Sequence, residues 1–158
     1  MTTGLLHDAV RDLEPEVQLA LVEEAGIPLL YPCERHPVYR HALAGVPLIS
    51  RAVGITDDRI LDAIAAHSYA RRGDRYDGPL SRCLRASDLV ASRQEWRGRE
   101  RLRCVVYGGR IEEAALLQCG WLMEYLQAEE GPVHPNLLSQ FEALSGKLGV
   151  AESFFVRW

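Results

Sequence analysis

The sequence predicts an all-α fold, because hydrophobic residues recur at helical spacing along most of the chain. No convincing run alternates in the manner of a strand, and the only β-prone stretch, at residues 104–107, is short and flanked by helical periodicity. A third observation concerns function, since ionisable residues repeatedly fall on the apolar faces of these helices. With 158 residues, of which 47% are hydrophobic, the chain can bury one core, so we expect a single domain over 1–158.

In the N-terminal half we expect helices at 1–12, 15–25, 40–53 and 57–70. Pro15 suits the first turn of the second helix, and Gly26 follows its end. Asp57 is a capping residue for the fourth helix. Pro47 is a misfit, because inside a helix it removes a backbone hydrogen bond and should kink the third helix or delay its start.

In the C-terminal half we expect helices at 79–92, 98–107, 110–128 and 135–148. The loop before the first of these is marked by Gly73-Asp74 and by Asp77-Gly78-Pro79. The last two helices are separated by Gly131-Pro132 and His134-Pro135.

The composition excludes several classes of partner. A net charge of −4 argues against a general nucleic-acid binder, and the lack of a signal peptide or an apolar run of membrane-spanning length predicts a cytoplasmic protein with no membrane partner. Arginine is concentrated between Arg71 and Arg110, which suits phosphate binding, although a solvated basic face is an equal alternative. The four cysteines have no metal-ligand spacing, and we expect Cys83 and Cys119 to be buried, reduced thiols.

Four helical segments each direct an ionisable side chain toward the predicted core. Burying an unpaired carboxylate is very costly, so several such groups converging with histidines predict a positively charged partner, most simply a metal ion. A lone inward histidine is more often a hydrogen-bonded core residue, and we interpret His36 and His134 in that way. The residues that we assign to the metal are His7, Asp8, His41, His67 and Asp88.

Five stretches of the chain resemble the HD-superfamily phosphohydrolases, and within them the YqeK-type symmetrical bis(5'-nucleosyl)-tetraphosphatases. The resemblance runs from residue 4 to about residue 144. It is carried by Leu5-Leu6-His7-Asp8 with Arg11-Asp12, by His41-Ala42-Leu43-Ala44-Gly45, by Ile60 to Ala70, by Leu84-Arg85-Ala86-Ser87-Asp88, and by Trp121 to Leu137 with Val133-His134-Pro135.

The resemblance implies an HD-domain helical bundle around a dinuclear metal site, with two divalent ions, iron in preference to manganese. It implies that His7, Asp8 and Asp88 bind one ion, that His41 and His67 bind the second, and that Asp8 bridges them. The implied reaction is symmetrical hydrolysis of diadenosine tetraphosphate to two ADP, with Asp8 and Arg11 in catalytic roles. The resemblance further implies that the substrate is bound by Arg11, Ser68, Arg71 and Arg93 near the entrance of the site.

The sequence also departs from this family. The family's metal site begins with another histidine about thirty residues before the His-Asp pair, so we expect the N-terminal helix that carries it to be missing from this sequence. The family's Thr-Thr-Gly after the metal histidine is replaced by Ser68-Tyr69-Ala70. An acidic residue usual after the second aspartate is Ala91 here, and the nearest equivalent of the following arginine is Arg93.

Three functions therefore remain open. The first is a dinucleoside polyphosphate hydrolase, and the second is an HD phosphohydrolase acting on another nucleotide, which the altered 68–70 segment favours. The third is a catalytically impaired HD-like domain that binds a nucleotide or a protein, which the missing histidine favours. A nucleotide is the expected small-molecule partner in the first two, and a homodimer is left open.

Overall fold

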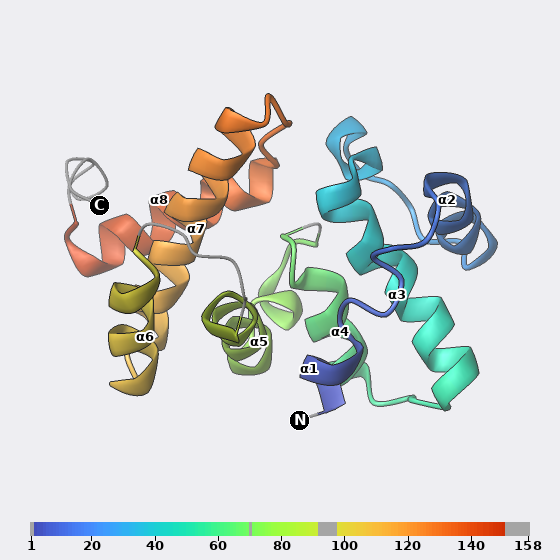
Figure 1. Cartoon of the computed structure of the whole chain (residues 1–158), viewed down its shortest axis with the longest axis horizontal. Coiled ribbons are helices and arrows are strands. Elements are labelled where there is room, and N and C mark those ends of the chain that lie inside the picture. Colours follow the sequence, from blue (N-terminus) through green and yellow to red (C-terminus); the bar gives the residue numbers. More distant parts are fainter. Residues whose placement is uncertain (1, 70, 92–97, 151–158) are drawn as a thin grey trace. The chain divides into compact units, whose positions relative to one another are not determined.

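The computed structural model describes residues 2–69, 71–91 and 98–150, and all the regular structure in these ranges is helical (Figure 1), which confirms the all-α prediction. Within these ranges no helix has the combination of length and hydrophobicity needed to cross a bilayer. The α-helices are α1 (Thr2–Leu6), α2 (Pro15–Glu24), α3 (Pro37–Val53), α4 (Asp58–Ala66), α5 (Pro79–Ala91), α6 (Arg99–Tyr107), α7 (Ile111–Ala128) and α8 (Pro135–Leu148), with 3₁₀ turns η1 (Pro32–Arg35) and η2 (Asp74–Tyr76).

The chain forms two compact units, Met1–Leu84 and Arg85–Trp158, which we describe separately. The prediction of a single domain stays a prediction.

In the first unit α3 is the central helix, and it packs against α2, α4 and η1. Its buried residues include Tyr39, Leu43 and Ile49, all almost fully excluded from solvent. The short α1 packs on α4, beside which it lies in Figure 1. This arrangement brings the chain that follows α1, the first half of α3 and the end of α4 together.

In the second unit α7 packs against both α6 and α8. Its core gathers Leu89 from α5, Leu102 and Val105 from α6, and Leu117 from α7. His134, which we expected to be structural, is fully buried and caps α8 by accepting a hydrogen bond from the Asn136 amide at its Nδ1. His36 likewise caps α3, by accepting from the Val38 amide.

Two predicted helices end earlier than their sequence pattern indicated. The first ends at Leu6 instead of residue 12, and the chain continues through a series of turns in which the amides of Ala9, Arg11 and Leu13 each bond a carbonyl three residues back. The fourth ends at Ala66 instead of residue 70, because Tyr69 has a φ of 64°, which no α-helix accommodates.

Two further details differ from expectation. Pro47 does not delay the start of α3, which begins at Pro37, three residues before the predicted start, and continues across Pro47 to Val53; the alternative, a kink at Pro47, stays a prediction. Cys83 is exposed, whereas Cys119 is buried as predicted.

Candidate metal centre

Three histidines and one aspartate of the first unit converge at one point. His7 and Asp8 lie in the turn directly after α1, His41 lies one turn into α3, and His67 caps the C-terminus of α4. Ligand atoms of His7, Asp8 and His67 all lie within 4.8 Å of one another. His41 joins them, with its Nε2 2.9 Å from Nε2 of His67 and 3.2 Å from Oδ1 of Asp8.

The backbone orients each ring in the same way. Nδ1 of His7 lies 3.0 Å from the carbonyl oxygen of Gly4, Nδ1 of His41 lies 2.8 Å from that of Pro37, and Nδ1 of His67 lies 2.7 Å from that of Ile64. A carbonyl oxygen only accepts hydrogen bonds, so each Nδ1 must carry its proton and donate it. The consequence is that Nε2 of each neutral ring presents a bare lone pair to the cluster, which is the arrangement usual for histidines that bind metal.

These lone pairs meet an ionised carboxylate. Nε2 of His67 lies 3.5 Å from Oδ1 of Asp8, and Nε2 of His7 lies 3.7 Å from Oδ2. Oδ1 is buried and has no hydrogen-bond partner among the described residues. Electron-rich atoms packed so closely repel one another unless a cation lies among them.

The donor set fits a divalent metal in both spacing and chemistry. Two ligand atoms about 2.1 Å from one cation, at angles of about 90–109°, lie about 3.0–3.4 Å apart. The separations of Nε2 of His41 from Nε2 of His67 and Oδ1 of Asp8, at 2.9 and 3.2 Å, are close to that range. Imidazole with carboxylate suits iron, manganese or zinc.

The protonation states agree with this interpretation. Burial raises the pKa of Asp8, but in the metal-free protein the His41 and His67 rings, when protonated at Nε2, donate to its carboxylate, and with the Arg11 guanidinium they outweigh burial and hold the pKa well below its usual value. Burial lowers the pKa of His67, and the nearby His41 and His7 lower it further, although Asp8 acts in the opposite direction. Asp8 is therefore anionic and His67 neutral, as metal ligands must be.

The predicted substrate residues of the first unit differ in burial and in what they contact. Arg11 is exposed, and its Nη1 donates to Oδ2 of Asp8 at 2.7 Å. Ser68 is buried next to His67, and Arg71 donates from Nη1 to the carbonyl oxygen of Pro28 at 3.3 Å. Their roles in substrate binding stay predictions.

Two predicted site residues are not brought to the cluster by the described structure. Asp88 is half-buried on α5 in the second unit, so its part in the metal site stays a prediction. Arg93 lies outside the described residues. The carbonyls of Gly4, Pro37 and Ile64 were missed by sequence reasoning, because their role depends on where each helix turn places them and leaves no trace in residue type.

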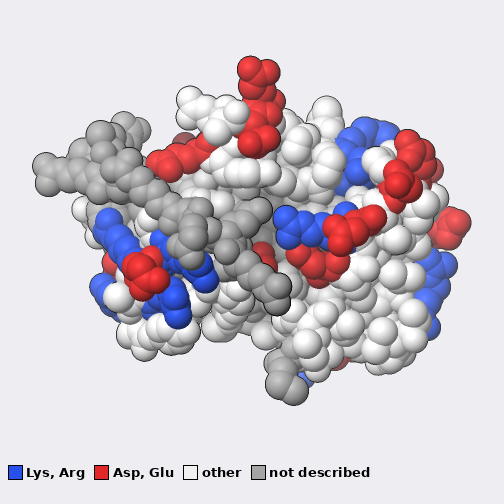
Figure 2. Space-filling view, in the orientation of Figure 1, with Lys and Arg blue, Asp and Glu red and all other residues white. Residues whose placement is uncertain are grey.

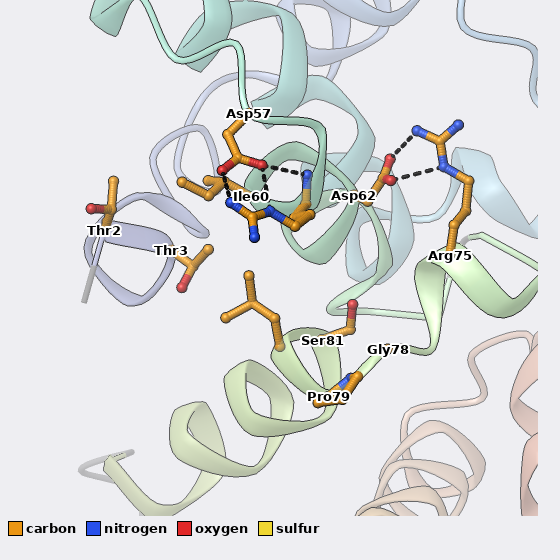
Figure 3. Close-up of a pocket in the computed structure, with 11 residues that line it drawn as sticks. Thr2, Thr3, Asp57, Ile60, Asp62, Arg75, Gly78, Pro79 and Ser81 are labelled. Carbon is orange, nitrogen blue, oxygen red and sulfur yellow. Dashed lines mark hydrogen bonds and ion pairs between the residues drawn. The ribbon is translucent and has the colours of Figure 1, made fainter.

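A separate pocket of about 550 Å³ lies between α1 and the N-terminal ends of α4 and α5 (Figure 3). None of the residues that line it belongs to the histidine cluster. Its two arginines are already paired, since Arg59 binds both carboxylate oxygens of Asp57 and Arg75 binds both of Asp62. This pairing leaves the pocket without a free cation for an anionic ligand.

The same pairing is visible at a larger scale. On the face of the molecule drawn in Figure 2, basic side chains lie in most places beside acidic ones. Further pairs join Arg82 to Asp77 and Lys147 to Glu112. Among the described residues, then, many of the basic groups are balanced locally by a neighbouring acid.

No protein-family model and no curated protein sequence matches this chain. A solved structure does: the crystal structure of a predicted HD superfamily hydrolase involved in NAD metabolism from Clostridium acetobutylicum. The two are 23% identical, with a TM-score of 0.79 over 92% of this chain and 75% of that one. The chain therefore has the helical fold of an HD-superfamily hydrolase, as its sequence motifs predicted.

Proposed function

We propose that this protein is a metal-dependent phosphohydrolase. The observation that carries the proposal is the convergence of three imidazole Nε2 atoms on the carboxylate of Asp8, whose Oδ1 is buried and otherwise unpaired among the described residues. The fold supports it, because an HD-superfamily hydrolase has the same helical arrangement.

The ligands would be His7, Asp8, His41 and His67, with Asp88 as the predicted fifth. A bound divalent cation supplies a nucleophile at neutral pH and neutralises charge on the phosphoryl group under attack. Each histidine is held in its orientation by a backbone carbonyl, so the lone pairs are preorganised before the ion arrives. Two ions, iron in preference to manganese, are the expected complement.

The first candidate substrate is diadenosine tetraphosphate. Water would add to an inner phosphorus and the anhydride bond between the second and third phosphates would break, giving two fully ionised ADP and two protons. Arg11 is placed to hold phosphate oxygens, because its guanidinium is exposed and lies 2.7 Å from the carboxylate of Asp8. Ser68, Arg71 and Arg93 would contact the flanking phosphates.

The second candidate is hydrolysis of another nucleotide at the same centre. It is favoured by the segment after His67, where the bulky ring of Tyr69 is buried with a positive φ. The structural neighbour is described as involved in NAD metabolism, which also directs attention to nucleotides other than diadenosine tetraphosphate.

Metal content tests the centre itself. Protein prepared anaerobically should contain iron or manganese, and the Asp8→Asn and His67→Ala variants should lose most of it. The Arg11→Ala variant is the matched control, because it removes a neighbour of Asp8 that is not a ligand, so its metal content should stay unchanged while its Michaelis constant rises. Negligible metal in all four proteins would overturn the proposal.

Product analysis then separates the candidates. ADP as the sole product from diadenosine tetraphosphate supports symmetrical cleavage, whereas AMP with ATP indicates attack at a different phosphorus. Turnover of another nucleotide with the dinucleotide left intact would replace the first candidate by the second. Metal bound without turnover of any nucleotide would instead indicate a binding domain.

A further inference from the structure

The turn that carries His7 and Asp8 is held by a side chain from another helix. Gln18 of α2 is only 2% exposed, and its Nε2 lies 2.9 Å from the carbonyl oxygen of Val10, 3.1 Å from that of Arg11 and 3.0 Å from that of Leu13. An amide nitrogen has two hydrogens, so these three acceptors use its full donor capacity. Gln18 thereby fixes the chain within five residues of Asp8.

A second buried side chain fixes Gln18 in turn. Nε of Arg40, which is 6% exposed, donates to Oε1 of Gln18 at 2.8 Å, and its Nη1 donates to the carbonyl oxygen of Arg35 at 2.8 Å. Arginine only donates and carbonyls only accept, so a single orientation of the Gln18 amide satisfies both sides. We call Gln18 and Arg40 the polar clamp.

The clamp links the two segments from which metal ligands come. Arg40 directly precedes His41 in α3, while the carbonyls bound by Gln18 lie two to five residues after Asp8. Local structure alone cannot hold Asp8, because α1 has only five residues and isolated helices below about 12–15 residues are marginal in water. The clamp therefore joins the segment that carries Asp8 to the helix that carries His41. Oδ1 of Asp8 lies 3.2 Å from Nε2 of His41.

We propose that Gln18 and Arg40 are positioning residues of the metal centre, which set its affinity by fixing the turn after Asp8 against α3. This inference rests on the proposed metal-dependent function. Burying an arginine whose two hydrogen bonds to Gln18 and Arg35 go to neutral oxygens costs free energy, and a role in shaping the centre accounts for its presence.

The Gln18→Glu variant tests the clamp most sharply. The carboxylate keeps the size of the side chain and still accepts from Arg40, but it cannot donate to the three carbonyls and repels them. Mn²⁺ affinity, measured by competition with a chelator, should fall about 10- to 100-fold, the range seen when groups that orient metal ligands are removed. The visible spectrum of the Co²⁺-loaded variant should change as well, because the arrangement of ligands around the ion changes.

Gln118→Met is the matched control. Gln118 is also a buried glutamine, but it lies on α7 in the second unit, so its loss should lower stability without altering Mn²⁺ affinity or the Co²⁺ spectrum. Arg40→Lys, which keeps a donor and the charge, should retain more affinity than Arg40→Met, and this pair provides the test if Gln18→Glu fails to fold.

The outcomes separate the clamp from the centre. Wild-type affinity and spectrum in folded Gln18→Glu protein would overturn the clamp while leaving the metal centre in place. Equal loss in Gln18→Glu and Gln118→Met would assign Gln18 a merely structural role. If the unsubstituted protein binds neither Mn²⁺ nor Co²⁺, the metal centre fails and the clamp's role fails with it.

Discussion

Tyr69 combines a buried ring with a backbone conformation that its side chain disfavours. It is 3% exposed and has a φ of 64°, and the left-handed region costs a residue with a Cβ roughly 1–2 kcal/mol. Replacing it by alanine removes the ring and keeps the strain, which should cost about 3–5 kcal/mol. Replacing it by glycine removes the ring and the strain together, at an entropic cost of about 0.5–1 kcal/mol.

The Tyr69→Gly variant should therefore be more stable than Tyr69→Ala, by about 0.75 kcal/mol from the difference between the midpoints of the strain and the entropic cost. For a chain of this size that corresponds to roughly 1–4 °C in melting temperature. Thermal and urea denaturation of both variants in a chelator measure the difference.

Two matched pairs make the test decisive. Glu130 also has a positive φ, of 52°, but is exposed, so Glu130→Gly should exceed Glu130→Ala in stability with little loss from packing. Ala143 is exposed within α8, where glycine should cost about 1 kcal/mol. If glycine is the less stable choice at position 69 by the margin seen at position 143, the backbone at Tyr69 is not strained and the reasoning is refuted.

Other perturbations have calculable outcomes. Leu117→Ala, at a fully buried position in the second unit, should cost about 2–5 kcal/mol in urea denaturation, and a loss below 1 kcal/mol would mean that this core is loosely packed. Removing metal with a chelator should lower stability by about 2.7 kcal/mol relative to protein at a Mn²⁺ concentration of 100 times the Kd, whereas identical melting curves would contradict a site in the folded state. In the metal-free protein burial lowers the pKa of His67, so as the pH falls the unfolded state binds a proton at this position before the folded state does. The free energy of unfolding should therefore decrease as the pH falls below about 6.5. This dependence on pH should be weaker in His67→Asn, and a rise in stability toward pH 5 would contradict the prediction.

The sequence predicted the residues of the cluster because a local apolar pattern directed each of them inward. His41 lies on the apolar stripe of α3, and His67 continues that of α4 as its C-cap, so periodicity alone directs them inward, and both are buried. The His-Asp pair was predicted for the same reason, although it lies in a turn after Leu6 instead of in a helix. The two side chains are half-buried, 13% and 29% exposed, so the pattern predicted their inward direction but not the backbone, because turns with three-residue hydrogen bonds and short helices place apolar residues alike.

Other features depend on contacts between segments far apart in the chain. The Gln18 side chain meets carbonyls of a preceding turn, and its partner Arg40 is 22 residues away, so neither has a signal in composition or spacing. The end of α4 was likewise hidden, because tyrosine gives no indication of a positive φ. Cys83 followed an apolar spacing on α5 and still faces solvent, since spacing identifies a stripe but not its edge.

The brevity of α1 has a consequence for how quickly a cation is exchanged. We expect so short a helix to open more often than the protein unfolds, and each opening would withdraw His7 and Asp8 from a cation bound at the proposed centre. The apparent affinity of the protein for the cation is then the intrinsic affinity multiplied by the fraction of molecules in which residues 2–8 are closed. Release of the ion should follow the opening rate of residues 2–8, and amide hydrogen exchange in that segment should slow on binding while exchange in α7 stays constant.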